Sequence, residues 1–107
     1  MQFGYSGKIA HVNLTNSEIW IEEPSDIFYR KYFGGRAFLA YYLLKEMRGE
    51  EDPLGPENVL VFASSVIGGS PSHGLCRFSV GAKSPLTGGF GESEAGGYWG
   101  PELKFSG

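Results

Sequence analysis

The segment from residue 75 to residue 107 carries the groups best suited to bind an anion. Arg77 stands at the head of a short alternating stretch, and a glycine-rich run follows from Gly88 to Gly100. Glycine lets the backbone approach a ligand closely, so that its N–H groups can point at negative charge. The rigid fork of a guanidinium suits a phosphate or a planar heterocycle. These residues predict a wall facing an anionic ligand, with tight turns and a surface arginine as the alternative.

Known nucleotide-binding loops do not match this glycine run. The stretch 89–94, Gly-Phe-Gly-Glu-Ser-Glu, lacks the third glycine of the dinucleotide fingerprint, and the sequence has no Gly-Lys-Ser or Gly-Lys-Thr of a P-loop. Its carboxylates, Glu92 and Glu94, have the spacing of an acid pair, but on a glycine-rich loop such groups are more often solvated. Spacing alone leaves turns and an anion site as competing interpretations.

Metal binding and nucleophilic chemistry have little support. His73 and Cys76 have a metal-like separation, but no further ligands stand near them, and a structural zinc ion needs four. Cys76 is the only cysteine, so it forms no internal disulfide and cannot hold an iron–sulfur cluster alone. No histidine is placed by the sequence to activate it, and a packing role is expected. His11, in the first expected strand, is expected to be structural.

Composition and charge narrow the class of protein. The chain has 107 residues, of which 41% are hydrophobic and 20% charged, so residues 1–107 are expected to form a single domain with one core. A net charge of −3 with scattered basic residues argues against nucleic acid as a partner. The sequence shows neither signal-peptide features nor an apolar run of membrane-spanning length. A cytoplasmic protein without a membrane partner is expected.

Alternating and helical patterns predict the elements that position these residues. Residues 8–14 and 18–22 alternate in polarity around a turn and predict a hairpin, with Ile19 and Ile21 inward. A helix is expected from the N-cap Ser25 to about residue 33, ending at a glycine pair. Residues 36–47 predict the clearest helix, with an apolar stripe formed by Leu39, Ala40, Leu43, Leu44 and Met47.

Two strands complete the expected fold. Residues 59–63 form a nearly continuous apolar run, which predicts a buried central strand. In the strand 77–82, one face carries Phe78, Val80 and Ala82, and the other carries Arg77 with small residues that leave room for a bulky partner. The predicted fold is α+β: an antiparallel or mixed β-sheet with two helices packed on it, as part of a larger N-terminal cofactor-binding domain.

Several blocks run along essentially the whole chain: Gly-Lys-Ile at 7–9, Val-Asn-Leu-Thr at 12–15, Gly-Gly-Arg at 34–36 and Asp-Pro-Leu-Gly-Pro-Glu-Asn at 52–58. Two closing blocks are the most specific, Lys-Ser-Pro-Leu-Thr-Gly at 83–88 and Gly-Gly-Tyr-Trp-Gly-Pro-Glu-Leu-Lys-Phe at 96–105. Together these blocks resemble the N-terminal domain of the tungsten-containing aldehyde ferredoxin oxidoreductase family.

This resemblance implies a bis-pyranopterin centre of tungsten (or molybdenum), with a magnesium ion bridging the pterin phosphates. It also implies a [4Fe–4S] cluster that passes electrons to ferredoxin, and oxidation of an aldehyde or related oxo compound to a carboxylic acid with oxygen from water. The family's cluster cysteines and second pterin motif lie downstream of this region. The implied partners are the remainder of the enzyme and ferredoxin, and the chain alone is expected to be inactive. The alternative is a stand-alone, non-catalytic binding or assembly module that keeps the family fold.

The resemblance also implies roles for single residues, although it assigns no catalytic residue. Arg77 matches the family's arginine between pterin and cluster, and Glu94, Ala95, Gly96 and Gly97 match a cofactor-contacting turn. The Glu94 carbonyl is a possible magnesium contact. Asparagine is common where Glu94 stands, and a carboxylate ~4 Å from a phosphate charge costs on the order of 4 kcal/mol at an effective dielectric near 20. We therefore expect Glu94 to point away, or to be neutralised by magnesium or a basic residue.

Overall fold

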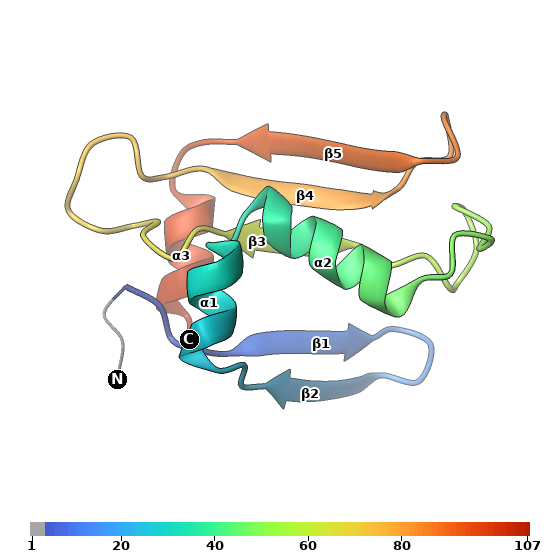
Figure 1. Ribbon diagram of the computed structural model, residues 1–107, viewed down its shortest axis with the longest axis horizontal. Coiled ribbons are helices and arrows are strands. Elements are labelled where there is room, and N and C mark those ends of the chain that lie inside the picture. The colour runs from blue at the N-terminus through green and yellow to red at the C-terminus, as the bar shows by residue number, and fades with distance from the viewer. Residues whose placement is uncertain (1–3) are drawn as a thin grey trace.

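Two antiparallel sheets and three helices make up the computed structural model, which describes residues 4–107 (Figure 1). A two-stranded hairpin comes first, two helices follow, and a three-stranded sheet and a last helix close the chain. The predicted α+β class is confirmed. Every pairing between strands in the described range is antiparallel, and the strands form two separate sheets rather than one.

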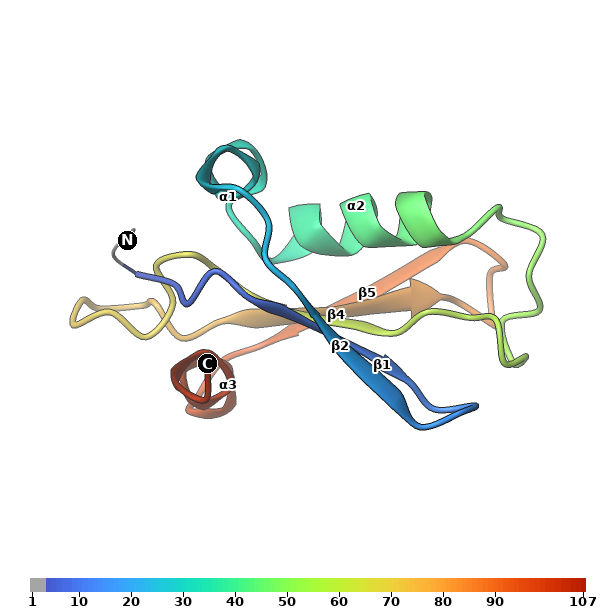
Figure 2. The same ribbon diagram turned by 90° about the horizontal axis from the view of Figure 1, so that it is seen from below.

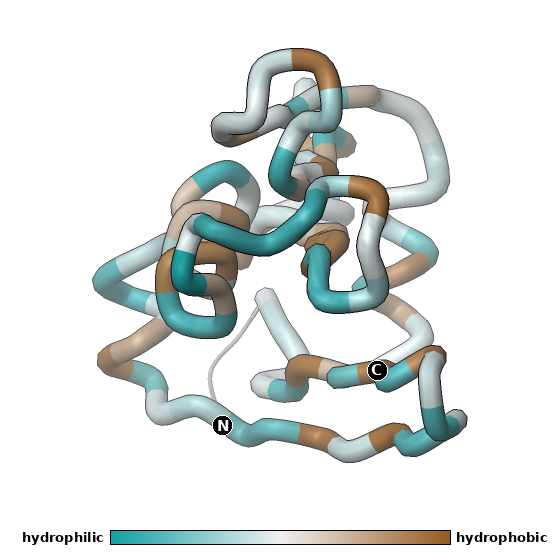
Figure 3. Tube along the Cα trace, turned by 90° about the vertical axis from the view of Figure 1, so that its right-hand side faces the viewer, coloured by the Kyte–Doolittle hydropathy of each residue, from teal (hydrophilic) through white to brown (hydrophobic). Residues whose placement is uncertain are grey.

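The hairpin consists of β1 (Ile9–Asn13) and β2 (Glu18–Glu22), with Ile9 opposite Glu22. Its position and register follow the alternating pattern of the sequence. The expectation that Ile19 and Ile21 point inward is wrong, because their exposed fractions are 68% and 52%. Within the described residues neither a strand nor a helix covers that side of the hairpin. Figure 3 shows hydrophobic and hydrophilic residues alternating along the stretch of chain at the lower edge of the view.

Helices α1 (Asp26–Tyr32) and α2 (Arg36–Glu46) meet at a tight turn. Ser25 is the N-cap of α1, as expected, although its side chain makes no capping hydrogen bond. Phe33 ends the helix in the left-handed region with φ 59°. Gly34 and Gly35 continue at φ 88° and 56°, a conformation that glycine adopts without a steric penalty. The turn thus changes the direction of the chain sharply between the two helices, which cross each other in Figures 1 and 2.

Helix α2 lies on the three-stranded sheet and carries much of the core. Its buried side chains are those of Phe38, Leu39, Tyr42 and Leu43. The predicted stripe is wrong at Leu44, which is 83% exposed. Successive residues of a helix are about 100° apart, so the position after Leu43 turns away from the sheet. The aromatic residues Phe38 and Tyr42 occupy the buried face in place of part of the expected aliphatic stripe.

The three-stranded sheet has the order β3 (Val61–Ser64), β4 (Phe78–Lys83), β5 (Phe90–Ala95). The apolar run 59–63 was expected to form the central strand, but β3 lies at an edge of this sheet and β4 at its centre. Phe62 of β3 is 49% exposed because it lies on the sheet face opposite α2. Figure 2 shows α1 and α2 on one side of this sheet and α3 (Trp99–Phe105) on the other.

The glycine-rich run contains regular structure that its composition did not indicate. Strand β5 and the start of α3 both fall between residues 88 and 100. Tight turns alone therefore do not describe it. These elements were not predicted from the sequence, because glycine weakens both the alternating and the helical pattern.

The small residues of β4 make room for α2 rather than for a ligand. Ser79 is 4% exposed, and Leu39, directly above, is fully buried. A Cβ atom added to Gly81 would lie 2.9 Å from Leu39 Cδ1 and 3.2 Å from the Gly91 carbonyl oxygen. The bulky partner expected on this face of the strand is thus a helix of the same chain.

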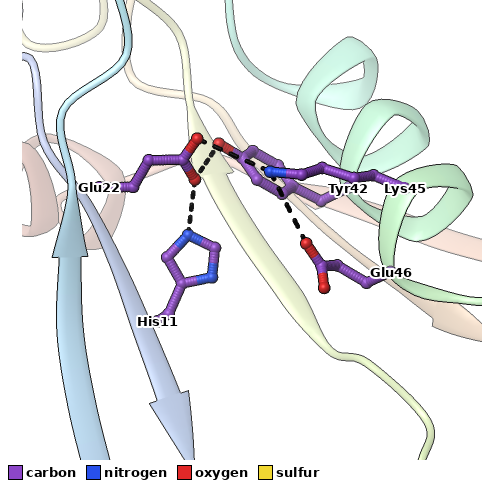
Figure 4. Close-up of polar contacts among 5 residues, drawn as sticks. All are labelled: His11, Glu22, Tyr42, Lys45 and Glu46. Atoms are coloured by element: carbon purple, nitrogen blue, oxygen red, sulfur yellow. Dashed lines mark hydrogen bonds and ion pairs between the residues drawn. The ribbon is translucent and has the colours of Figure 1, made fainter.

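A polar network joins the hairpin to α2 (Figure 4). The Glu22 carboxylate accepts hydrogen bonds from His11 Nε2 at 2.7 Å and from the Tyr42 hydroxyl at 3.0 Å, and Lys45 Nζ lies 3.7 Å from its other oxygen. Burial by itself would raise the pKa of Glu22, but these three neighbours together lower it. His11 therefore has the structural role that the sequence suggested.

Replacing Gly81 by alanine tests the close approach of α2 and β4. The added methyl group meets Leu39, which has no room to move, so we expect the free energy of unfolding to fall by about 1–3 kcal/mol. Gly89→Ala is the matched control, since its Cβ would meet only Thr87 Oγ1 at 3.8 Å. Denaturant unfolding of both variants measures the difference, and equal stabilities would contradict the packing described here.

The lowered pKa of Glu22 predicts a loss of stability in acid. A carboxyl group with a depressed pKa in the folded state stabilises the fold above its unfolded-state value, and that contribution disappears as the pH falls through the folded-state pKa. Between pH 5 and pH 3 the wild type should therefore lose more stability than Glu22→Gln. Thermal unfolding across this range provides the test, with Glu57→Gln as an exposed control. Parallel curves for the wild type and Glu22→Gln would refute the prediction.

Candidate functional site

Four charged side chains alternate in sign where the start of α2 meets the strands β4 and β5. Arg36 Nε lies 2.7 Å from Glu92 Oε2, and Arg36 Nη2 lies 3.5 Å from Glu94 Oε1. Arg77 Nη1 lies 4.0 Å from Glu94 Oε2. We call Glu92, Arg36, Glu94 and Arg77, in this order, the charge ladder. Its two cations and two anions balance, so it has no net charge.

The glycine turn and the pleat of β5 build this ladder. The Gly35 N–H donates to the Ser64 carbonyl at 3.1 Å, and a Cβ atom on Gly34 would overlap that same carbonyl. Only glycine fits against the end of β3 here, and Arg36 follows directly as the first residue of α2. Residues two apart on a strand share a face, so Glu92 and Glu94 point to the same side of the sheet.

The ladder is closed at one end and open at the other. Along the ladder the exposed fraction of the side chain is 13% at Glu92, 66% at Arg36, 38% at Glu94 and 70% at Arg77. Glu92 Oε1 is buried without a hydrogen-bond partner among the described residues. The Arg77 guanidinium, at the outer end, keeps most of its donors open to solvent.

The structure brings the residues predicted to contact a cofactor to one place. Glu94 and Ala95 end β5, and Gly96 and Gly97 follow at the surface beside Arg77. Gly97 has φ 100°, and a Cβ atom placed there would find no other atom within 4 Å. Glu94 lies 3.5 Å from Arg36 and 4.0 Å from Arg77, so basic residues that could neutralise it are at hand. Whether these groups hold a cofactor remains a prediction.

Arg36 and Glu92 were not predicted to belong to this site. Arg36 stood in the Gly-Gly-Arg block, but Glu94 lies 58 positions further along the chain, and no local pattern links them. Glu92 was expected to be solvated, and this is wrong. It became buried because β5, which the glycine-rich run concealed, places it under the N-terminus of α2.

Helix α3 anchors the loop that leads to Arg77. Lys104 Nζ donates to the carbonyls of Ser65, Val66 and Gly68 at 3.1, 2.7 and 2.8 Å. Burial lowers the pKa of the Lys104 ammonium. Cys76 lies nearby, and a Cβ atom on Gly96 would be 3.6 Å from its sulfur. One lysine thus adds three side-chain hydrogen bonds to the backbone hydrogen bonds that the loop makes itself.

Neither a metal cluster nor a membrane helix is present among residues 4–107. In that range no group of three or more His, Cys, Asp or Glu side chains could hold a metal ion. His73 is exposed on the loop. Over the same residues no helix is long and apolar enough to cross a membrane.

An aromatic cluster lies on the sheet face opposite α2. The ring of Trp99 lies 4.4 Å from that of Phe78 and 5.4 Å from that of Phe62, between centroids. Trp99 and Phe62 are 46% and 49% exposed. We call these three residues the aromatic patch, and α3 covers only part of it.

Residues 9–107 match the family described as "Aldehyde ferredoxin oxidoreductase, N-terminal domain". The chain belongs to this family. A tungsten-containing aldehyde ferredoxin oxidoreductase of Pyrococcus abyssi is 47% identical over 105 residues, which are 98% of this chain and 17% of the relative. The corresponding enzyme of Pyrococcus furiosus is 41% identical over the same shares, and an aliphatic sulfonate oxidoreductase, WOR-like subunit, of that organism is 34% identical over 109 residues, again 98% and 17%.

A solved structure agrees with this assignment to the aldehyde ferredoxin oxidoreductase family. The active-site complex BamBC of benzoyl coenzyme A reductase, bound to 1,5-dienoyl-CoA, superimposes with a TM-score of 0.94 at 34% identity. The likeness covers 100% of this chain and 16% of that one. The chain therefore spans about a sixth of the length of its relatives, and its fold matches the N-terminal portion of a larger family member.

Replacing Lys104 by methionine should release the loop that leads to the site. Three carbonyls each lose one hydrogen bond, so we expect the protein to lose about 1–3 kcal/mol of stability and the amides of residues 67–75 to exchange faster. Lys8→Met, at an exposed lysine, is the control. Hydrogen exchange read by mass spectrometry measures both, and unchanged loop protection in Lys104→Met would show that the lysine does not hold the loop.

Proposed function

We propose that this chain forms part of the cofactor-binding base of a tungsten-containing oxidoreductase, with Arg77 and the turn at Gly96 and Gly97 facing a pterin phosphate. The observation that carries the proposal is the open end of the charge ladder, where the exposed Arg77 directly precedes β4 and the exposed glycine turn directly follows its partner strand β5. We propose tungsten as the metal because four of the relatives are named as tungsten-containing.

The residues at the open end fit an anionic group. Arg77 contacts Glu94 only at 4.0 Å, the outer limit of an ion pair, so its donors remain available for a phosphate. The ladder is neutral, because Arg36 and Arg77 together balance the charges of Glu92 and Glu94. Gly97 is exposed, and the space where a Cβ atom would stand is open. The backbone carbonyl of Glu94 as a magnesium contact, and the turn residue Ala95, belong to the same proposal.

The proposed reaction is the oxidation of an aldehyde to a carboxylic acid, with water supplying the oxygen and ferredoxin accepting the electrons. When bound, the tungsten bis-pyranopterin centre supplies the two-electron chemistry, and a [4Fe–4S] cluster passes the electrons on. This chain's own residues bind and orient the cofactor. Arg77 supplies a permanent cation, and the glycine turn lets the backbone approach the cofactor closely. Its single cysteine cannot hold the cluster, whose ligands we place in the remainder of the enzyme.

We further propose that residues 1–107 form one domain whose main partner is the remainder of the enzyme. The aromatic patch supports this, because Phe62 and Trp99 expose large apolar surfaces beside the sheet. The relatives support it too, since the matching region is only 17% of their length. On this view the isolated chain has no activity of its own.

Aldehyde is the substrate class that we favour, although this region does not by itself select the substrate. The relatives from 47% to 40% identity are all named for aldehydes. Two proteins at 34% identity are named for other substrates, one for an aliphatic sulfonate and one for benzoyl coenzyme A. Because the same fold occurs in proteins named for different substrates, we place the groups that select the substrate outside this chain.

Replacing Arg77 by glutamine tests the proposed contact with the cofactor. In the full-length protein we expect roughly a tenfold weaker retention of tungsten, since a charge-assisted hydrogen bond contributes about 1.5–3 kcal/mol. The unfolding temperature should not change, because Arg77 is 70% exposed. Tungsten per polypeptide is measured by plasma mass spectrometry against Arg30→Gln, an exposed arginine on α1. Equal tungsten in both variants would overturn the role of Arg77.

The chain on its own should not oxidise aldehydes. We expect the purified polypeptide of residues 1–107 to give no aldehyde-dependent reduction of a viologen dye, because the cluster ligands and most of the proposed site are missing. The full-length protein is the positive control. Dye reduction by the short polypeptide would disprove this expectation.

A further inference from the structure

We propose that Arg36 is a positioning residue that holds Glu94 away from Arg77 and thereby keeps the Arg77 guanidinium free for a phosphate. This inference rests on the proposed function, because it concerns the same anion site. It adds a residue to which neither the sequence blocks nor the relatives assign a role.

Glu94 has two guanidinium groups within reach. Its Oε1 lies 3.5 Å from Arg36 Nη2, and its Oε2 lies 4.0 Å from Arg77 Nη1. The contact with Arg36 is a hydrogen bond as well as an ion pair, and the longer contact with Arg77 is an ion pair alone. The carboxylate therefore belongs mainly to Arg36. A small rotation toward Arg77 would occupy the donors that a phosphate needs.

Arg36 can hold Glu94 because Glu92 holds Arg36. The Arg36 Nε to Glu92 Oε2 distance of 2.7 Å is that of a charge-assisted hydrogen bond. The side chain of Glu92 is only 13% exposed and rises from the paired part of β5, opposite Gly81. Arg36 is itself 66% exposed, so this buried anchor fixes a guanidinium that would otherwise be free to move in solvent.

Without Arg36 the charges rearrange in a predictable direction. Two carboxylates on one face of β5 would then share a single nearby cation, and the site would carry one negative charge instead of none. Glu94 would turn to Arg77, and a phosphate would meet both an occupied guanidinium and a net repulsion. Neutralising Glu94 should remove this competition, whether or not Arg36 is present.

A double-mutant cycle with inorganic phosphate tests the proposal. The protein is the full-length polypeptide grown without tungstate or molybdate, and phosphate binding is followed by phosphorus NMR and calorimetry. We expect Arg36→Gln to weaken phosphate binding roughly three- to fivefold, the scale of exposed ion pairs. Glu94→Gln should bind at least as well as the wild type. In the double variant, Arg36→Gln should cause almost no further loss.

The controls separate positioning from a general electrostatic effect. Arg48→Gln removes the same charge just beyond the other end of α2 and should leave phosphate binding close to that of the wild type. If Arg36→Gln weakens phosphate binding equally in the wild type and in Glu94→Gln, Arg36 acts only through the electrostatic attraction of its charge for phosphate. That result would overturn the inference. So would an equal loss in Arg48→Gln.

Two further results keep the test decisive. If the wild type and Arg77→Gln bind phosphate equally, the proposed anion site itself fails, together with the inference. If Arg77→Gln loses phosphate binding but the effects of Arg36→Gln and Glu94→Gln on that binding are additive, only the inference fails. Should Arg36→Gln not fold, Arg36→Lys replaces it: lysine keeps the charge but cannot contact both carboxylates, and a loss that Glu94→Gln abolishes supports the same conclusion.

Discussion

The contact between Leu39 and Gly81 is the constraint on which the rest of the structure depends. Leu39 is fully buried, and at Gly81 the strand offers no side chain, so α2 rests almost directly on the backbone of β4. This sets the height of α2 above the sheet. Because Arg36 begins the same helix, that height also sets how closely its guanidinium approaches Glu92 on β5. Core packing and the polar site are therefore fixed by one interatomic approach.

Local patterns predicted the elements well where polarity alternates clearly, and poorly where glycine interrupts it. The hairpin, both early helices and β4 lie close to their expected positions, because each has its own periodicity. Strand β5 and helix α3 were missed within the glycine-rich run. The wrong prediction for β3 has another cause. An apolar run indicates that the side chains of a strand favour burial, but not whether residues of this chain bury them. Phe62 remains half exposed for that reason.

The site was predicted in part for the same physical reasons. Arg77 and Glu94 were expected to contact a cofactor because the chain resembles a family, and the structure places their side chains 4.0 Å apart. Arg36 and Glu92 were missed, because their pairing joins a helix start to a distant strand and leaves no trace in local spacing. Long-range ion pairs of this kind become visible only once the register of β4 and β5 and the position of α2 are known.

The grip of Lys104 on the loop at residues 65–68 has a consequence for the order in which the chain folds. The lysine follows the three carbonyls that it binds by 36 to 39 positions. A ribosome must therefore complete both later strands and most of α3 before that loop obtains its donor, and closing so long a segment costs conformational entropy. The full set of hydrogen bonds at the approach to Arg77 is thus complete only after α3 has been synthesised.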